Sequence, residues 1–201
     1  MIKLTLANMN AIKHSCLKYH YAGRVPVVAI GFNVYEDEEW CGTIVYGWGA
    51  NPHIANIYDM WNGQVLELVR VALNGKQKKT SECLGRSLKL LKKYCPMVDL
   101  VVSYADVDEN HKGIIYKATN WLYVGKVNEG KKTNFVIKGK NVHQRSIGGK
   151  GWKINLEWLK LNVDKNAKQE VTKGKHKFLY ALDKDVKKRI SDLSKDYASI
   201  V

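Results

Sequence analysis

The sequence predicts a mixed α/β (α+β) fold, in which a central mixed sheet is flanked by helices. Short runs rich in β-branched residues alternate with segments of helical periodicity, which is typical of this class. Hydrophobic residues make up 45% of the 201 residues, enough to bury a full core. Because there are only three prolines and no Ser/Gly-rich run, we expect one domain over residues 1–201.

The first predicted strands cover residues 25–34 and 41–47, and the acidic run Glu36–Glu39 between them predicts an antiparallel hairpin. A third strand covers residues 64–73. It contains two charged residues, Glu67 and Arg70, within an apolar run. Buried charges need a partner, so both are expected to be paired.

An amphipathic helix is predicted around Leu84, Leu88 and Leu91, which share one helical face. Thr80 or Ser81 is its expected N-cap. The remaining predicted elements are a strand buried on both faces at 98–104, a short helix at 113–120, strands at 121–127, 135–137 and 177–182, and a terminal helix from residue 183.

The charge is distributed unevenly along the chain. Residues 1–110 carry 12 Lys/Arg against 11 Asp/Glu, whereas residues 111–201 carry 21 against 8. We therefore expect a basic C-terminal extension from about residue 128 to 201. An excess of this sign attracts nucleic acid through counterion release, although a solvated lysine-rich surface is the alternative.

Four cysteines, Cys16, Cys41, Cys83 and Cys95, lack metal-site or disulfide spacing and are expected to be reduced and mostly buried. No apolar stretch is long enough to span a bilayer, and the N-terminus lacks a signal peptide. We therefore expect a cytoplasmic protein without a membrane partner. A homodimer is left open.

Two segments carry the residues expected to do chemistry. The loop at residues 74–81 contains Lys76, Lys78 and Lys79 before a helix N-terminus, which favours an anion such as a pyrophosphate. The segment from Ser103 to Gly125 places polar residues directly after a buried strand, where functional groups gather. For each residue taken alone, capping or solvation is the simpler explanation.

Residues 65–125 resemble the GNAT acyltransferase superfamily, because a core strand leads through a phosphate-binding loop into a helix. The run from Ile115 to Gly125 is similar to that superfamily's closing LYxxxGFxxxG pattern. The resemblance implies an acyl-CoA such as acetyl-CoA as cofactor, with Tyr116 near the thioester. Lys78, Lys79, Gly85 and Asn120 would bind the cofactor, and Gly85 is the only glycine near the place where the superfamily has several.

A narrower resemblance covers most of the chain. His20-Tyr21, Glu67-Leu-Val-Arg70, Val102-Ser-Tyr-Ala-Asp106, Ile115-Tyr-Lys-Ala-Thr-Asn-Trp-Leu-Tyr-Val-Gly125 and Lys175-His-Lys-Phe-Leu-Tyr180 resemble the phage Mom family. That family modifies DNA adenine, converting the N6 amino group to a carbamoylmethyl derivative that blocks host restriction enzymes, and is associated with iron. The resemblance implies this active-site set: His20, Tyr21, Glu67, Arg70, Ser81, Asp106 and Tyr116. Iron would be held by His20, Tyr21 and Asp106, whose N and O donors suit it.

If the resemblance holds, double-stranded DNA is the partner. The phosphates would be contacted by Lys138, Lys140, Arg145, Lys150 and Lys153. Adenine N6 is hard to reach inside a duplex, so base flipping is expected. Trp48, Trp61, Trp121 or Trp152 could stack on the extruded base, although a place in the core is the commoner role of a tryptophan. Two other functions stay open: an N-acyltransferase acting on a protein amine or small molecule, and a DNA-binding protein without catalysis on a GNAT scaffold.

Overall fold

A computed structural model describes residues 1–131, 134–143, 147 and 155–196. The described chain divides into two compact units. The first comprises residues 1–105, 112–125 and 177–196, and the second comprises residues 106–111 and 126–176. Each unit is described by itself.

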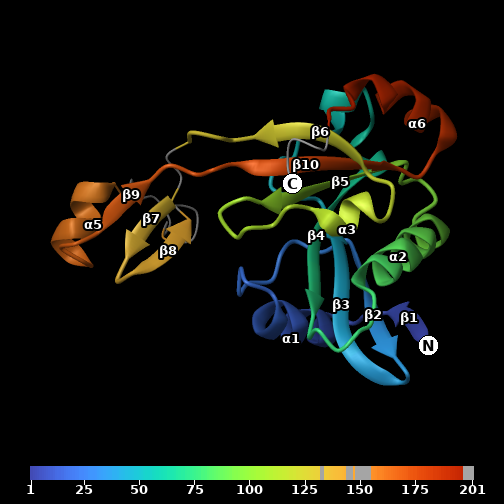
Figure 1. The fold of residues 1–201 in the computed structure, drawn as a ribbon, viewed down its shortest axis with the longest axis horizontal. Helices are drawn as coiled ribbons and strands as arrows, with labels where there is room; N and C mark the ends of the chain where they lie inside the picture. The colour runs from blue at the N-terminus through green and yellow to red at the C-terminus, as the bar shows by residue number, and fades with distance from the viewer. Residues whose placement is uncertain (132–133, 144–146, 148–154, 197–201) are drawn as a thin grey trace. The chain divides into compact units, whose positions relative to one another are not determined.

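The larger sheet has seven strands in the order β1-β2-β3-β4-β5-β10-β6 (Figure 1). Its strands are β1 (Ile2–Leu6), β2 (Ile30–Glu36), β3 (Glu39–Gly47), β4 (Val65–Leu73), β5 (Leu100–Asp106), β6 (Leu122–Val127) and β10 (Lys175–Ala181). The helices of the first unit are α1 (Met9–Tyr19), α2 (Thr80–Tyr94), α3 (Ile114–Lys117) and α6 (Lys184–Ile190), with 3-10 turns η1 (Ala55–Tyr58), η2 (Asn62–Gln64) and η3 (Ser191–Leu193).

Strands β4 and β5 pair in parallel over a short length. The register joins Val65–Glu67 to Leu100–Val102, and both strands then continue beyond the paired residues, to Leu73 and Asp106. By contrast, β3 and β4 pair as antiparallel neighbours from Gly47 to Gly42. The backbone of β4 after Glu67 therefore faces β5 without a ladder, and its polar groups on that side need other partners.

Both faces of the sheet are covered. On one face, Leu84, Leu88 and Leu91 of α2 pack with Leu66 and Leu68 of β4. On the other face, Ile12 and Cys16 of α1 pack with Val69 and Ala72, while η1 and α6 cover Val65, Leu100 and Val102. Successive residues of β4 point to opposite faces, so one strand delivers side chains to both layers.

The second unit contains β7 (Asn134–Ile137), β8 (Lys140–His143), β9 (Lys168–Glu170) and α5 (Leu156–Asn162). The strands form an antiparallel sheet in the order β8-β7-β9. Its core is small and consists of Phe135, Leu159 and Ala167, with Ile137 and Trp158 packed against it. None of the helices that the structure describes is long and apolar enough to cross a membrane.

Several predictions about the elements are confirmed, including the hairpin that turns through Glu36–Glu39 and the burial of both faces of β5. The N-cap prediction is wrong, because α2 begins at Thr80 and Lys79 is its N-cap. The predicted strand at 25–34 begins only at Ile30, since Pro26 lacks the N–H that a ladder needs. The helix predicted at 113–120 is a single turn.

Candidate active site

The point where β4 and β5 part is bridged by two hydroxyl groups. Ser103 Oγ on β5 donates to the Leu68 carbonyl oxygen on β4 at 3.2 Å, and the Tyr116 hydroxyl lies 2.8 Å from Ser103 Oγ. Because the Ser103 proton is used on Leu68, the Ser103 oxygen accepts from the Tyr116 O–H. The bridge therefore fixes Tyr116 as a hydrogen-bond donor where the two strands separate.

Tyr116 is held in an aromatic cluster and is only 7% exposed. Its ring stacks on Phe178 at 4.6 Å between centroids and meets the edge of Trp121 at 5.1 Å. Gly113, at φ +80°, begins the helix turn, and a Cβ there would collide with the Phe178 ring. Glycine is thus required for α3 to present Tyr116 at this point.

Burial raises the pKa of Tyr116 to about 12, the Ser103 hydrogen bond opposes the shift, and the negative charge of Glu67 adds to it. Burial and Glu67 likewise raise the pKa of Tyr104 on β5 to about 12. Both phenols are therefore neutral near pH 7. Tyr116 can donate a proton but is a poor base.

Glu67 and Arg70 project from β4 at the parting of the strands. The Arg70 guanidinium donates from Nη1 to the Val69 carbonyl oxygen at 2.5 Å, whereas its Nε is buried without a hydrogen-bond partner among the described residues. Burial lowers the Arg70 pKa, and the charges of Cys16, Tyr21 and Glu67 oppose that shift. Glu67 has little room, since a Cβ on Gly49 would collide with its Oε2.

Four of the predicted residues in the first unit are linked by electrostatic effects on their pKa values. They are Tyr21, Glu67, Arg70 and Tyr116. Tyr21 and Glu67 both act on the pKa of Arg70, and Glu67 acts on that of Tyr116. His20 ends α1, and its Nδ1 accepts from the Ala22 N–H at 3.1 Å. The His20 and Tyr21 rings lie 4.3 Å apart, and Tyr21 is 52% exposed, so this pair forms the solvent-exposed side of this group of residues.

Asp106 is placed with the second unit, and both of its carboxylate oxygens are engaged there. Oδ2 lies 2.8 Å from the Lys175 ammonium, and Oδ1 accepts from the Asp108 N–H at 3.1 Å. The described residues contain no group of three or more His, Cys, Asp or Glu side chains that could hold a metal ion. Asp106 is thus paired with a lysine in this structure, and no step is derived through iron. The iron site stays a prediction.

Of the predicted cofactor residues, Lys78 and Lys79 directly precede α2 and Gly85 lies in its first half. The first-turn N–H groups of Thr80 and Ser81 precede any helical acceptor, and Lys79 makes no side-chain cap. A Cβ on Gly85 would meet only Thr119 Cγ2, at 3.9 Å, so the end of α3 with Asn120 lies beside an open helix surface. This arrangement fits a pyrophosphate group.

Two of the three lysines in the loop at residues 74–81 are already paired with acidic side chains. Lys78 pairs with Asp37 at 3.3 Å, and Lys76 pairs with Glu39, so the acidic β2–β3 turn neutralises them. Among the described residues, the side chain of Lys79 has no ion-pair partner and is exposed. Lys79 and the helix N-terminus therefore supply the remaining attraction for an anion.

Of the residues predicted for DNA contact, Lys138 and Lys140 lie exposed at the β7–β8 turn of the second unit. Arg145, Lys150 and Lys153 lie outside the described residues, as does Trp152. Trp121 is buried against Tyr116 and takes the core position that is the commoner role of a tryptophan, which leaves Trp48 and Trp61 as candidates among the described residues. Trp48 is 46% exposed and Trp61 is 83% exposed.

Ser103 is a site residue that was not predicted from the sequence. The available signal was a hydroxyl in the middle of the apolar run Val101-Val-Ser-Tyr-Ala105, where a polar group needs an internal partner. All four cysteines are free as predicted, three of them buried. Burial raises the pKa of each thiol, which opposes formation of a nucleophilic thiolate.

Comparisons with known proteins bear on the family and the fold of the chain. The family model of the Mom protein family matches residues 3–199. The methylcarbamoylase mom of Escherichia phage Mu is 22% identical over 179 residues, which cover 86% of this chain and 72% of the phage protein. An acetyltransferase of Bacillus subtilis, solved in complex with CoA, is similar in structure with a TM-score of 0.51 and 11% identity, covering 91% of this chain and 100% of that chain. The predicted GNAT-like fold is confirmed.

Proposed function

Because the chain belongs to the Mom protein family, we propose that it is a transferase that modifies adenine in phage DNA. The product is a carbamoylmethyl-type derivative of the N6 amino group, which protects the DNA from restriction enzymes in the host cytoplasm. The observation that carries the proposal is the parting of β4 and β5 in an acyltransferase fold, where the charge of Glu67 acts on the pKa of both Tyr116 and Arg70.

The residues at this parting have complementary roles. Glu67 supplies a carboxylate that accepts a proton from the attacking amino group. Tyr116 keeps its proton near pH 7 and donates it to the leaving group. The Arg70 guanidinium, with a buried N–H left unused by the protein, stabilises negative charge that develops between them. The half-exposed Tyr21 side chain lies on the solvent side of these residues.

An acyl-CoA fits at the N-terminus of α2. Ser81 and Thr80 would bind its pyrophosphate through backbone N–H groups, with Lys79, Lys78, Gly85 and Asn120 as the other expected contacts. Bound there, it would supply carbon atoms for the added group; attack of N6 on its carbonyl carbon would give an N6-acyl adenine and not a carbamoylmethyl group, so no transfer step is assigned to the thioester. The backbone of β4 beyond Glu67, unpaired toward β5, offers hydrogen bonds to a ligand placed in the gap.

Double-stranded DNA is the proposed partner, held by lysines of the second unit such as Lys138 and Lys140. The unequal distribution of charge supports DNA over a protein amine or a small molecule, because a polyanion gains most from a concentrated excess of lysine.

Restriction protection tests the proposal. Plasmid DNA from cells that express the protein is digested with restriction enzymes whose sites contain adenine, beside DNA from cells expressing Tyr116→Phe. We expect resistance with the wild-type protein and full cleavage with the variant. Equal cleavage of both DNAs, with soluble protein in both cultures, contradicts the proposal.

A further inference from the structure

The near-neutral N-terminal half of the chain contains one segment without any acidic residue. Residues 1–35 carry four Lys/Arg and no Asp/Glu, whereas residues 36–110 carry 8 Lys/Arg against 11 Asp/Glu. Helix α1 lies within the first of these segments. Helices α2, α5 and α6 each have an acidic side chain in the first turn, but α1 has none. Every formal charge on α1 is therefore positive, which attracts a polyanion.

The outer face of α1 consists of two adjacent rows of exposed side chains, because residues four apart lie above one another on a helix. They are Met9, Lys13 and Leu17 in one row, and Asn10, His14 and Lys18 in the other. The inner face is buried through Ile12 and Cys16, which pack on β3 and β4. The outer face is therefore available to a partner along the full length of the helix.

The polar groups of this face are not used within the part of the chain that the structure describes. Asn10 makes no side-chain hydrogen bond there, and Lys13 makes no ion pair. Lys18 lies over the Tyr19 ring, 5.8 Å from its centroid. Met9 is 55% exposed and Leu17 is 50% exposed, so apolar groups face water beside these polar ones. A partner that covers the face would remove that apolar surface from water.

The C-terminal end of α1 reaches the candidate active site. Tyr19 is followed by His20 and Tyr21, and the charge of Tyr21 acts on the pKa of Arg70. The helix has 11 residues. With a rise of about 1.5 Å per residue, it extends roughly 16 Å away from this end. Base pairs are about 3.4 Å apart, so a duplex at the site would have several base pairs within the length of α1.

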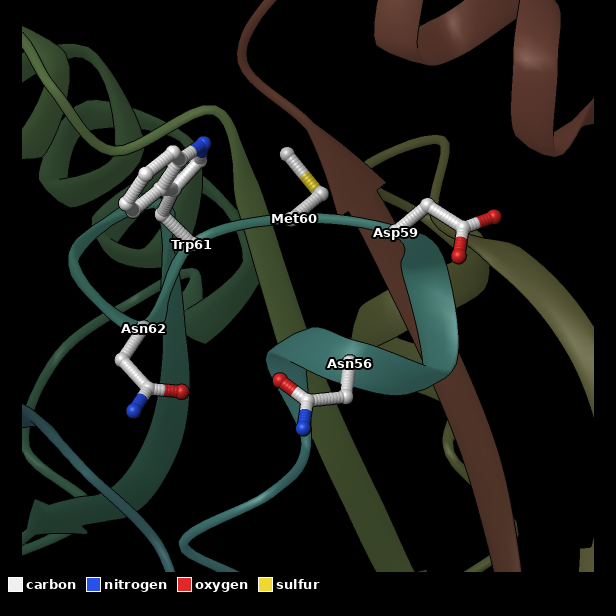
Figure 2. A pocket seen from close by; sticks show the side chains of 5 residues that line it. All are labelled: Asn56, Asp59, Met60, Trp61 and Asn62. Atoms are coloured by element: carbon white, nitrogen blue, oxygen red, sulfur yellow. The ribbon is translucent and has the colours of Figure 1, made fainter.

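A second exposed polar feature of the first unit suits a duplex less well. A hollow of about 430 Å³ lies along η1 and η2 and is lined by Asn56, Asp59, Met60, Trp61 and Asn62 (Figure 2). These side chains point in different directions, and the only formal charge among them is the negative charge of Asp59. A carboxylate repels phosphates, so α1 is the better docking face for DNA.

We propose that α1 lies in the major groove of duplex DNA beside the modified adenine and selects its sequence context. The inference rests on the proposed function for the partner, double-stranded DNA, and adds the helix, the groove and the base-reading side chains. The major groove is about 12 Å wide and admits an α-helix. Asn10 bonds N6 and N7 of an adenine, Lys13 donates to guanine O6 or N7, and Leu17 contacts a thymine methyl group. Lys18 contacts a phosphate.

Selection from a pool of random duplexes tests the inference. The sequence that binds the full-length wild-type protein most tightly is made again with 7-deazaadenine and 7-deazaguanine. These bases lack the N7 acceptors of the major groove, while every phosphate is kept. Fluorescence anisotropy at constant salt gives the Kd values. We expect the wild type to bind the selected natural duplex roughly tenfold tighter than its 7-deaza form or an unselected duplex.

Variants of α1 separate base reading from charge. Asn10→Ala with Lys13→Ala should reduce the preference for the selected duplex below about threefold, because the contacts to base edges are lost. Lys18→Ala should weaken the selected and unselected duplexes by the same factor, since a phosphate contact carries no sequence information.

Lys89→Ala with Lys93→Ala is the matched control, because it removes two exposed lysines from α2 and should keep the tenfold preference. The inference is wrong if no sequence is enriched, or if the wild type binds the natural and 7-deaza duplexes equally. It is also wrong if Asn10→Ala with Lys13→Ala keeps the wild-type preference.

Nucleoside analysis of DNA from cells that express the same proteins separates this inference from the proposed function. Modified deoxyadenosine, together with an unchanged preference of the Asn10→Ala, Lys13→Ala variant, overturns the inference and leaves the proposed function standing. Unmodified deoxyadenosine with the wild type, together with a preference that depends on α1, supports the inference and overturns the proposed transferase activity.

Discussion

Arg70 carries a guanidinium group into the interior of the first unit, where burial lowers its pKa and Nε finds no partner among the described residues. Removing one of two interacting charges leaves the other uncompensated, and Glu67 would remain. We therefore expect Arg70→Met to lower the free energy of unfolding by about 1–3 kcal/mol, while abolishing adenine modification. Urea denaturation and nucleoside mass spectrometry measure the two effects.

Arg86→Met is the matched control for that variant. Arg86 pairs with Glu82 at 2.8 Å on α2 and donates to the Ile2 carbonyl oxygen at 2.7 Å. Its loss should cost some stability and leave modification unchanged. If Arg70→Met retains activity, the buried cation is structural and its proposed role is wrong.

The buried tyrosines predict how stability changes at alkaline pH. The pKa of Tyr104 and Tyr116 is raised to about 12, and burial raises those of Tyr46 and Tyr58 as well. The unfolded chain releases these protons near pH 10, whereas the folded protein keeps them. Their contribution is therefore complete below pH 10 and is lost as the pH rises toward 12 and beyond.

Denaturant titrations at pH 8, 10 and 11.5 measure this loss. The free energy of unfolding should be highest at pH 8 and lower at pH 11.5. Exposed tyrosines such as Tyr21 and Tyr94 ionise in the folded protein, whereas the remaining tyrosinate absorbance should appear together with unfolding. Full tyrosinate absorbance in the folded protein near pH 10 would show that these phenols are not buried.

Single residues were predictable to different degrees. Glu67 and Arg70 stood out because charges interrupt an apolar strand, and the charge of Glu67 does act on the pKa of both Arg70 and Tyr116. Tyr116 itself came from a resemblance, since nothing in its local sequence reveals the aromatic cluster around it. Ser103 was missed because its partner, Leu68, is distant in sequence and is met only through the register of β4 and β5.

At the level of elements, two buried serine–tyrosine hydrogen bonds can be compared directly by removing the serine hydroxyl of each. Ser103 bonds Tyr116 at 2.8 Å between β5 and α3, and Ser87 bonds Tyr46 at 2.6 Å between α2 and β3. Ser103→Ala and Ser87→Ala each leave a buried phenol without its partner, and each should cost about 1–3 kcal/mol of unfolding free energy.

Only Ser103→Ala is expected to reduce modification, because its pair lies where β4 and β5 part. Both variants are compared by denaturation and by the fraction of modified deoxyadenosine in cellular DNA. A similar loss of modification in both variants would mean that activity follows stability alone, and the bridge would have no specific function.

Elements with strong periodicity were found from sequence, and weakly patterned ones were not. Helix α2 was predicted because Leu84, Leu88 and Leu91 mark one face. Helix α1 was missed, since it buries only Ile12, Ser15 and Cys16, two of which are not strongly apolar. Strand β1 was missed because it is an edge strand with few buried positions, where pairing to β2 rather than burial holds it.

At the scale of the whole molecule, electrostatic attraction to DNA should be separable from chemistry. Lys138 and Lys140 lie exposed at one turn of the second unit. Replacing both with alanine should weaken binding of duplex DNA. The logarithm of the association constant falls with the logarithm of the salt concentration, and the steepness of this fall should decrease by about 2. Filter binding or anisotropy over a series of salt concentrations measures the slope.

Lys89→Ala with Lys93→Ala is the control, because it removes two exposed lysines from one face of α2. The slope should then change by less than about 1. An equal change for both pairs would mean that DNA attraction is spread over the whole surface and is not concentrated at the β7–β8 turn.

The central claim is that Tyr116, at the parting of β4 and β5, serves the modification of adenine. Mass spectrometry of nucleosides from cells that express the wild type or Tyr116→Phe tests it most directly, with DNA binding measured on the purified proteins. The account predicts a heavier derivative of deoxyadenosine with the wild type only, and equal DNA binding by both. Unmodified deoxyadenosine with the soluble wild-type protein, or full modification with Tyr116→Phe, would contradict it.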